Sequence, residues 1–86
     1  MGQKYRVKAT AGEGEQAESK VIETNDFDTA EITLHVYARK LRRKYKSGET
    51  ITVCLYNVTT GDPELLAQYV RCDGRERLTS LVSETL

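Results

Sequence analysis

The chain has 86 residues, and its thirteen basic and thirteen acidic side chains cancel, so the total charge does not indicate a strongly basic nucleic-acid binder. Apolar residues make up 38% and charged residues 30%, which is typical of a folded domain and excludes a disordered chain. No apolar run is long enough to span a bilayer or to form a signal peptide. We therefore expect a single small cytoplasmic domain over residues 1–86.

Two strands are predicted before residue 25. In residues 4–10, basic residues alternate with Tyr5, Val7 and Ala9, the pattern of a half-buried strand. Two glycines among acids in residues 11–15 then indicate a turn. A second strand is expected over about residues 16–24, and its polar composition favours an edge of the sheet.

An amphipathic helix is predicted over residues 28–46. Asp28 is a candidate N-cap, Glu31 completes a capping-box pattern, and Gly48 suits the C-terminal end. Seven residues share one face of this helix and predict its buried side: Phe27, Ala30, Leu34, Tyr37, Ala38, Leu41 and Tyr45. Alternation within residues 32–38 also fits a strand, but a strand would leave the caps unused and interrupt the apolar stripe.

Two further strands are predicted after the helix. Residues 50–58 are rich in β-branched and aromatic side chains, so we expect them at the centre of the sheet. A turn at residues 59–63 leads to a strand over about residues 65–72. Residues 73–86 are expected to form a short helix, with Leu78, Leu81 and Val82 on one side, or a frayed tail.

These elements predict an α+β fold, in which a four-stranded antiparallel sheet of ββαββ order carries one long helix on one face. The expected core comprises Tyr5, Val7, Leu34, Leu41, Ile51, Val53 and Leu55. In outline, this order resembles that of many small proteins encoded by phages and mobile elements, including several that inhibit bacterial defence complexes. The resemblance is one of architecture, and no functional residue is transferred through it.

Positive charge is concentrated on the predicted helix. Residues 39–46 hold six basic side chains and no acid, whereas seven acids and four bases precede His35. The predicted partner-binding residues lie on the side of the helix away from the core: Ile32, His35, Val36, Arg39, Arg42, Arg43 and Lys46. An alternative interpretation is a solvated face balanced by Glu13, Glu15 or Glu18.

Catalytic and metal-binding motifs are not evident in the sequence. It has one histidine, no glycine-rich phosphate loop and no nucleophile beside an evident base, so we expect no enzymatic activity and no cofactor. Cys54 and Cys72 match no common zinc spacing, and His35 is the only other soft ligand, so free thiols are the better interpretation.

Three functions remain open at this point. An acidic protein partner is favoured by the exposed aliphatic pair Ile32 and Val36 and by the neutral total charge. Nucleic-acid backbone binding by the same helix is favoured by its clustered arginines. A homodimeric structural protein is the third alternative, with Glu31 of one subunit facing Arg39 and Arg43 of the other.

Overall fold

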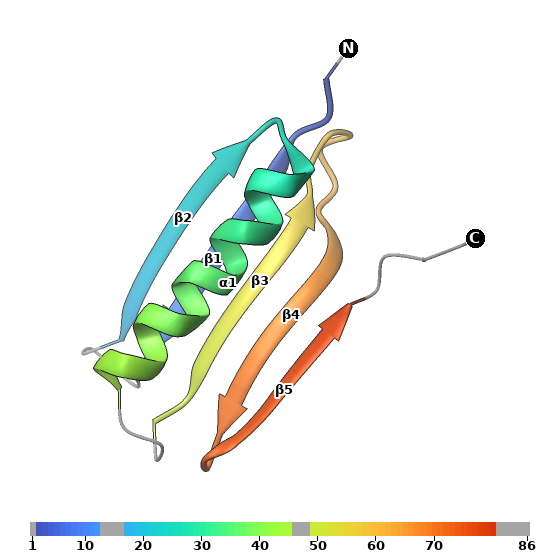
Figure 1. The fold of residues 1–86 in the computed structure, drawn as a ribbon. Helices are drawn as coiled ribbons and strands as arrows, with labels where there is room; N and C mark the ends of the chain where they lie inside the picture. Colours follow the sequence, from blue (N-terminus) through green and yellow to red (C-terminus); the bar gives the residue numbers. More distant parts are fainter. Residues whose placement is uncertain (1, 13–16, 46–48, 81–86) are drawn as a thin grey trace.

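The computed structural model describes residues 2–12, 17–45 and 49–80. Within these residues, a five-stranded antiparallel sheet of order β2-β1-β3-β4-β5 carries a single helix, α1, on one face (Figure 1). The elements are β1 (Tyr5–Ala11), β2 (Glu18–Thr24), α1 (Phe27–Lys44), β3 (Ile51–Asn57), β4 (Glu64–Cys72) and β5 (Arg75–Ser80). The α+β class is as predicted, and so are the edge position of β2 and the central position of β3.

The prediction of four strands was wrong, because residues 75–80 form a fifth strand and not a helix. Asp73 and Gly74 both have positive φ, 54° and 77°, which suits a two-residue type I′ hairpin turn. The turn reverses the chain so that Arg75 pairs with Cys72, and pairing continues to Ser80 opposite Ala67. Leu81 and Val82, the other members of the predicted apolar stripe, lie outside the described residues.

Helix α1 begins one residue earlier than predicted, and its N-cap is Asp26 rather than Asp28. The Asp26 carboxylate accepts hydrogen bonds from the backbone N–H of Thr29 at 3.0 Å and from its hydroxyl at 2.6 Å. These bonds lower the pKa of Asp26, with the Thr29 hydroxyl as the largest cause. Asp26 is the N-cap because Thr29 donates two hydrogen bonds to its carboxylate. Asp28 lies in the first turn, where the helix dipole favours an acid.

The helix ends at Lys44, two residues before the predicted end. Tyr45 is the C-cap, and its backbone N–H donates to the carbonyl of Leu41 at 2.8 Å. The buried side chain of Arg71 on β4 donates to the Tyr45 carbonyl at 2.9 Å, so a guanidinium lies at the negative end of the helix dipole. The predicted terminal residues Lys46 and Gly48 lie outside the described residues.

The core lies between α1 and the centre of the sheet. Ala30, Leu34, Tyr37, Ala38 and Leu41 of the helix are buried, as the predicted apolar stripe requires. They pack on Val7, Ile51, Val53 and Leu55, each with no exposed surface, and Tyr5 packs at the margin. Burying a large aliphatic side chain contributes about 1.5–3 kcal/mol, so these contacts are the main source of stability.

The sheet extends beyond the cover that α1 provides. The helix packs chiefly on β1 and β3, with a smaller contact to β2. The β4–β5 hairpin lies to one side of the helix (Figure 1). Pairing places Tyr69 opposite Val53 and Leu78 opposite Tyr69, so these residues continue the helix-side surface of the sheet. A part of that surface is therefore not covered by α1.

Candidate partner-binding surface

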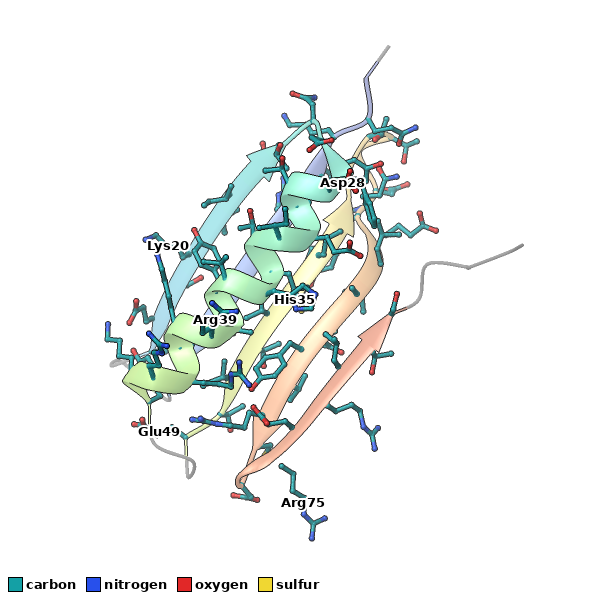
Figure 2. All side chains as sticks on the ribbon, viewed as in Figure 1. Lys20, Asp28, His35, Arg39, Glu49 and Arg75 are labelled. Atoms are coloured by element: carbon teal, nitrogen blue, oxygen red, sulfur yellow. The ribbon has the colours of Figure 1, made fainter. Side chains whose placement is uncertain are left out.

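The side of α1 turned away from the sheet combines exposed aliphatic and basic side chains. We define the outer helix face as Ile32, Val36, Arg39 and Arg43, which are spaced three or four residues apart and so lie on one side of the helix. Ile32 is 62% exposed and Val36 is 38% exposed, although both are large apolar residues. His35 and Arg39 are also exposed and are labelled in Figure 2.

The other predicted partner-binding residues have different positions. Arg42 is turned toward β5, where its Nη1 lies 3.3 Å from Oε1 of Glu76. His35 lies at the border between the outer helix face and this β5 side of the helix. Lys46 lies outside the described residues. The structure thus brings together Ile32, His35, Val36, Arg39 and Arg43, and it places Arg42 in a second site.

Acids on the neighbouring strands partly balance the basic run. Lys44 pairs with Glu18 of β2 at 2.7 Å, and Arg42 pairs with Glu76 of β5. Glu18 is one of the compensating acids that the sequence suggested, whereas Glu13 and Glu15 lie outside the described residues. Within residues 2–12, 17–45 and 49–80, no ion pair to Arg39, Lys40 or Arg43 is present. Positive charge therefore remains available on the outer helix face.

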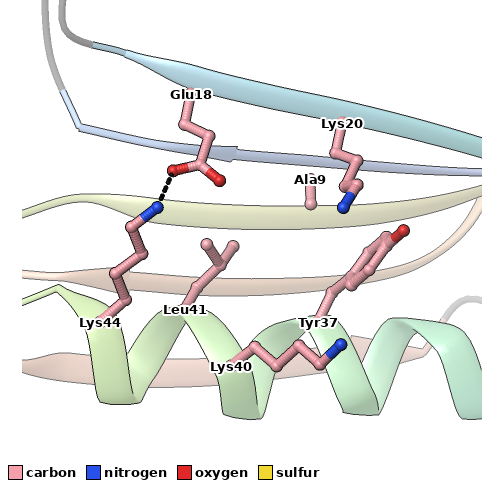
Figure 3. A pocket seen from close by; sticks show the side chains of 7 residues that line it. All are labelled: Ala9, Glu18, Lys20, Tyr37, Lys40, Leu41 and Lys44. Carbon is pink, nitrogen blue, oxygen red and sulfur yellow. Dashed lines mark hydrogen bonds and ion pairs between the residues drawn. The ribbon is translucent and has the colours of Figure 1, made fainter.

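A small pocket of about 160 Å³ lies on the β2 side of α1 (Figure 3). Its lining consists of Ala9, Glu18, Lys20, Tyr37, Lys40, Leu41 and Lys44. Glu18 lies at one end of the pocket, where its Oε2 accepts hydrogen bonds from Lys44 at 2.7 Å and from the Tyr45 hydroxyl at 2.6 Å. These two bonds lower the pKa of Glu18, and the Lys44 bond is the larger cause. The Glu18 carboxylate is therefore bonded to groups of the fold itself.

A larger groove of about 310 Å³ lies on the other side of α1. We define the β5-side groove by its lining residues, His35, Ala38, Arg39, Arg42, Tyr69, Glu76 and Leu78. Tyr69 is buried and lies in the sheet beneath the groove, whereas Leu78 is 55% exposed. Arg42 reaches across toward the sheet, with its guanidinium carbon 5.9 Å from the centroid of the Tyr69 ring. The groove thus combines an apolar floor with a basic wall.

The acid in this groove is held by internal partners. Oε1 of Glu76 accepts from the Tyr69 hydroxyl at 2.6 Å and from Arg42 at 3.3 Å. These bonds lower the pKa of Glu76, with Tyr69 as the larger cause. Burial, and secondly the bond to Glu76, raises the pKa of Tyr69 to about 12. Glu76 is therefore charged and Tyr69 neutral at neutral pH.

Sequence reasoning missed Tyr69, Glu76 and Leu78 as site residues. The signal for the last two was the Asp73-Gly74 dipeptide, a strong hairpin marker that would have placed residues 75–80 beside β4. The nearness of Glu76 to Arg42 has no local signal, because the two residues lie 34 positions apart in the chain.

Among residues 2–12, 17–45 and 49–80, no group of three His, Cys, Asp or Glu residues could hold a metal ion. Cys54 is buried on β3 and Cys72 is exposed at the end of β4, and both are free thiols. The described helix is not long and apolar enough to cross a membrane.

Comparisons with protein-family models, with curated proteins and with solved structures found no match to this chain.

Proposed function

We propose that the chain is a small cytoplasmic interaction module, without enzymatic activity, that binds an acidic protein partner through the outer helix face. The observation that carries this proposal is that Arg39 and Arg43 share one helix face with the exposed Ile32 and Val36. Neither arginine has an ion-pair partner within the described residues. Exposed aliphatic side chains bordered by charge are typical of protein-binding surfaces.

Each kind of side chain has a separate part in the proposed interface. Carboxylates of the partner would accept paired hydrogen bonds from the guanidinium groups of Arg39 and Arg43, which match a carboxylate in shape. Ile32 and Val36, which precede the two arginines on the same side of the helix, would be desolvated by the partner, where apolar contact contributes affinity. The charges would speed association and make it sensitive to salt.

Capture from a lysate of the source cell, with and without nuclease treatment, tests the proposal. The wild type is compared with an Arg39→Ala, Arg43→Ala double variant and with an Ile32→Ser variant. A Lys8→Ala, Arg77→Ala double variant is the matched control, because it removes the same charge from exposed residues on the sheet face opposite α1. We expect one acidic protein that the wild type and the control retain, and that both helix variants lose.

Two outcomes would contradict the proposal. Equal capture by all four proteins would show that the outer helix face is only a solvated surface. Loss of capture after nuclease treatment would favour nucleic acid, and the salt dependence would confirm it, since log affinity falls with a slope of about −0.9 per phosphate contacted on duplex DNA. A protein partner should give a shallower slope and should depend on Ile32.

A further inference from the structure

Helix α1 leaves space for one more helix on the same side of the sheet. Neighbouring strands lie about 4.8 Å apart, so the axes of the outermost of the five strands are separated by about 19 Å. Packed helices lie about 8–10 Å apart, and α1 rests chiefly on β1 and β3. The uncovered width over β4 and β5 therefore corresponds to one helix diameter.

The β5-side groove occupies this space, and its floor is suited to an apolar side chain. Tyr69 and the exposed Leu78 are paired across β4 and β5 on the helix side. On the α1 side the wall includes Ala38, whose small side chain allows close approach of a second helix. An exposed leucine beside a buried aromatic ring is a contact surface that the described fold leaves unused.

The charged side chains around the groove determine which charge a bound segment should carry. Arg39 and Arg42 line its helix wall, together with His35, and Glu76 is already bonded to Tyr69 and Arg42. A second copy of the chain offering its own α1 would bring arginines against arginines, which is unfavourable. An acidic occupant would instead gain ion pairs with Arg39 and with the outer edge of Arg42.

We infer that the β5-side groove receives an acidic amphipathic helix of the partner, lying beside α1 on β4 and β5. Its apolar side chains pack on Tyr69 and Leu78, and its acidic flank faces Arg39 and Arg42. The six residues of β5 span about 20 Å, which corresponds to about 13 helical residues, or between three and four turns. This inference rests on the proposed function and specifies which part of the partner is bound, and where.

Selection from a displayed library of random 16-residue peptides on the immobilised protein tests the inference with a defined probe. We expect enriched sequences that are rich in Asp and Glu and that carry apolar residues three and four positions apart. A synthetic peptide of this kind should gain helicity on binding, as measured by circular dichroism. A scrambled peptide of equal composition is the control for charge alone.

Two matched variants separate the groove from the outer helix face. Leu78→Ser should weaken binding of the enriched peptide by at least about tenfold, whereas Ile32→Ser should have a smaller effect. Both residues are more than half exposed, so both variants are expected to fold, and thermal unfolding checks this. A loss with Ile32→Ser alone would overturn the groove inference and leave the proposed function intact.

The remaining outcomes decide against one or both proposals. Enrichment of acidic peptides that bind in extended form, without gain of helicity, would overturn the helical occupant while leaving an acidic partner. Selection that yields no acidic peptides would overturn both the inference and the proposed function.

Discussion

The two flanks of α1 have the same arrangement of polar groups but differ in the burial of their apolar side chains. On the β2 flank, Glu18 accepts from Lys44 and from the Tyr45 hydroxyl through a single carboxylate oxygen. On the β5 flank, Glu76 likewise accepts from Arg42 and the Tyr69 hydroxyl. In each case a helix cation and a tyrosine hydroxyl meet one strand carboxylate.

The two flanks differ in how far an apolar side chain is exposed to solvent. Leu41 on the β2 flank is buried against the sheet, beside a pocket of about 160 Å³. Leu78 on the β5 flank is 55% exposed beside a groove of about 310 Å³. Each flank has one ion pair near the surface, where such pairs contribute little to stability, so the flanks differ in the burial of their leucines and not in charge pairing.

The largest expected effect comes from shortening the leucine on each flank. Leu41→Ala should lower the free energy of unfolding by about 2–5 kcal/mol, because it removes buried contacts and leaves a cavity. Leu78→Ala should change it by less than about 0.5 kcal/mol, as should the surface substitution Arg43→Ala. Urea denaturation measures all three, and equal losses for Leu41 and Leu78 would show that the flanks are not different.

A smaller effect is expected from the Tyr69 hydroxyl at high pH. Burial raises its pKa from 10.0 to about 12 in the folded state, so folding favours the neutral phenol. The stability that this provides is present in full below pH 10 and is lost as the pH rises from about 10 to about 12. Unfolding measurements on Tyr69→Phe should show a weaker decline over this interval than the wild type.

Spectrophotometric titration gives an independent check of the same group. The difference between wild type and Tyr69→Phe should show one phenol that ionises near pH 12. A difference spectrum centred at pH 10 would mean that the β5-side groove admits water to the hydroxyl, and the groove floor would then be less closed than described.

The smallest effect is expected at Glu18 on the β2 flank. Its pKa is lowered below 4.5, first by Lys44 and then by Tyr45, so the associated stability is present above pH 4.5 and is lost as the pH falls through the folded pKa. Carbon-detected NMR titration should show the Glu18 midpoint rising in Lys44→Met. Lys40→Met is the matched control from the same pocket, and an equal rise there would show that general charge, not the hydrogen bond, is responsible.

Local periodicity accounts for the parts of the fold that could be predicted. The apolar stripe of α1 and the alternation in β1 are repeated patterns, so each element was identified even where its ends were displaced by one or two residues. Residues 75–80 were misassigned because Leu78, Leu81 and Val82 also fit helical spacing. The Asp73-Gly74 turn decided the outcome, since it pairs the following residues with β4.

The outer helix face could be located from the sequence because it lies on one element. Its exposed Ile32 and Val36 and its basic residues follow from the helix wheel once the buried stripe is known. The β5-side groove could not be located in this way. It requires β5 to lie beside β4, and it requires Glu76 to meet Arg42, which only the tertiary arrangement provides.

The position of β1 has a consequence for the order of folding during synthesis. It precedes the other described strands in the sequence, yet it lies between β2 and β3 in the sheet, and it pairs Val7 with Leu55. Until β3 has left the ribosome, the β1–β2 hairpin and α1 therefore lack the core residues Ile51, Val53 and Leu55, and a long loop must close before these contacts form. The β3–β4–β5 meander, by contrast, consists of sequence-local pairings and can form as soon as it is made.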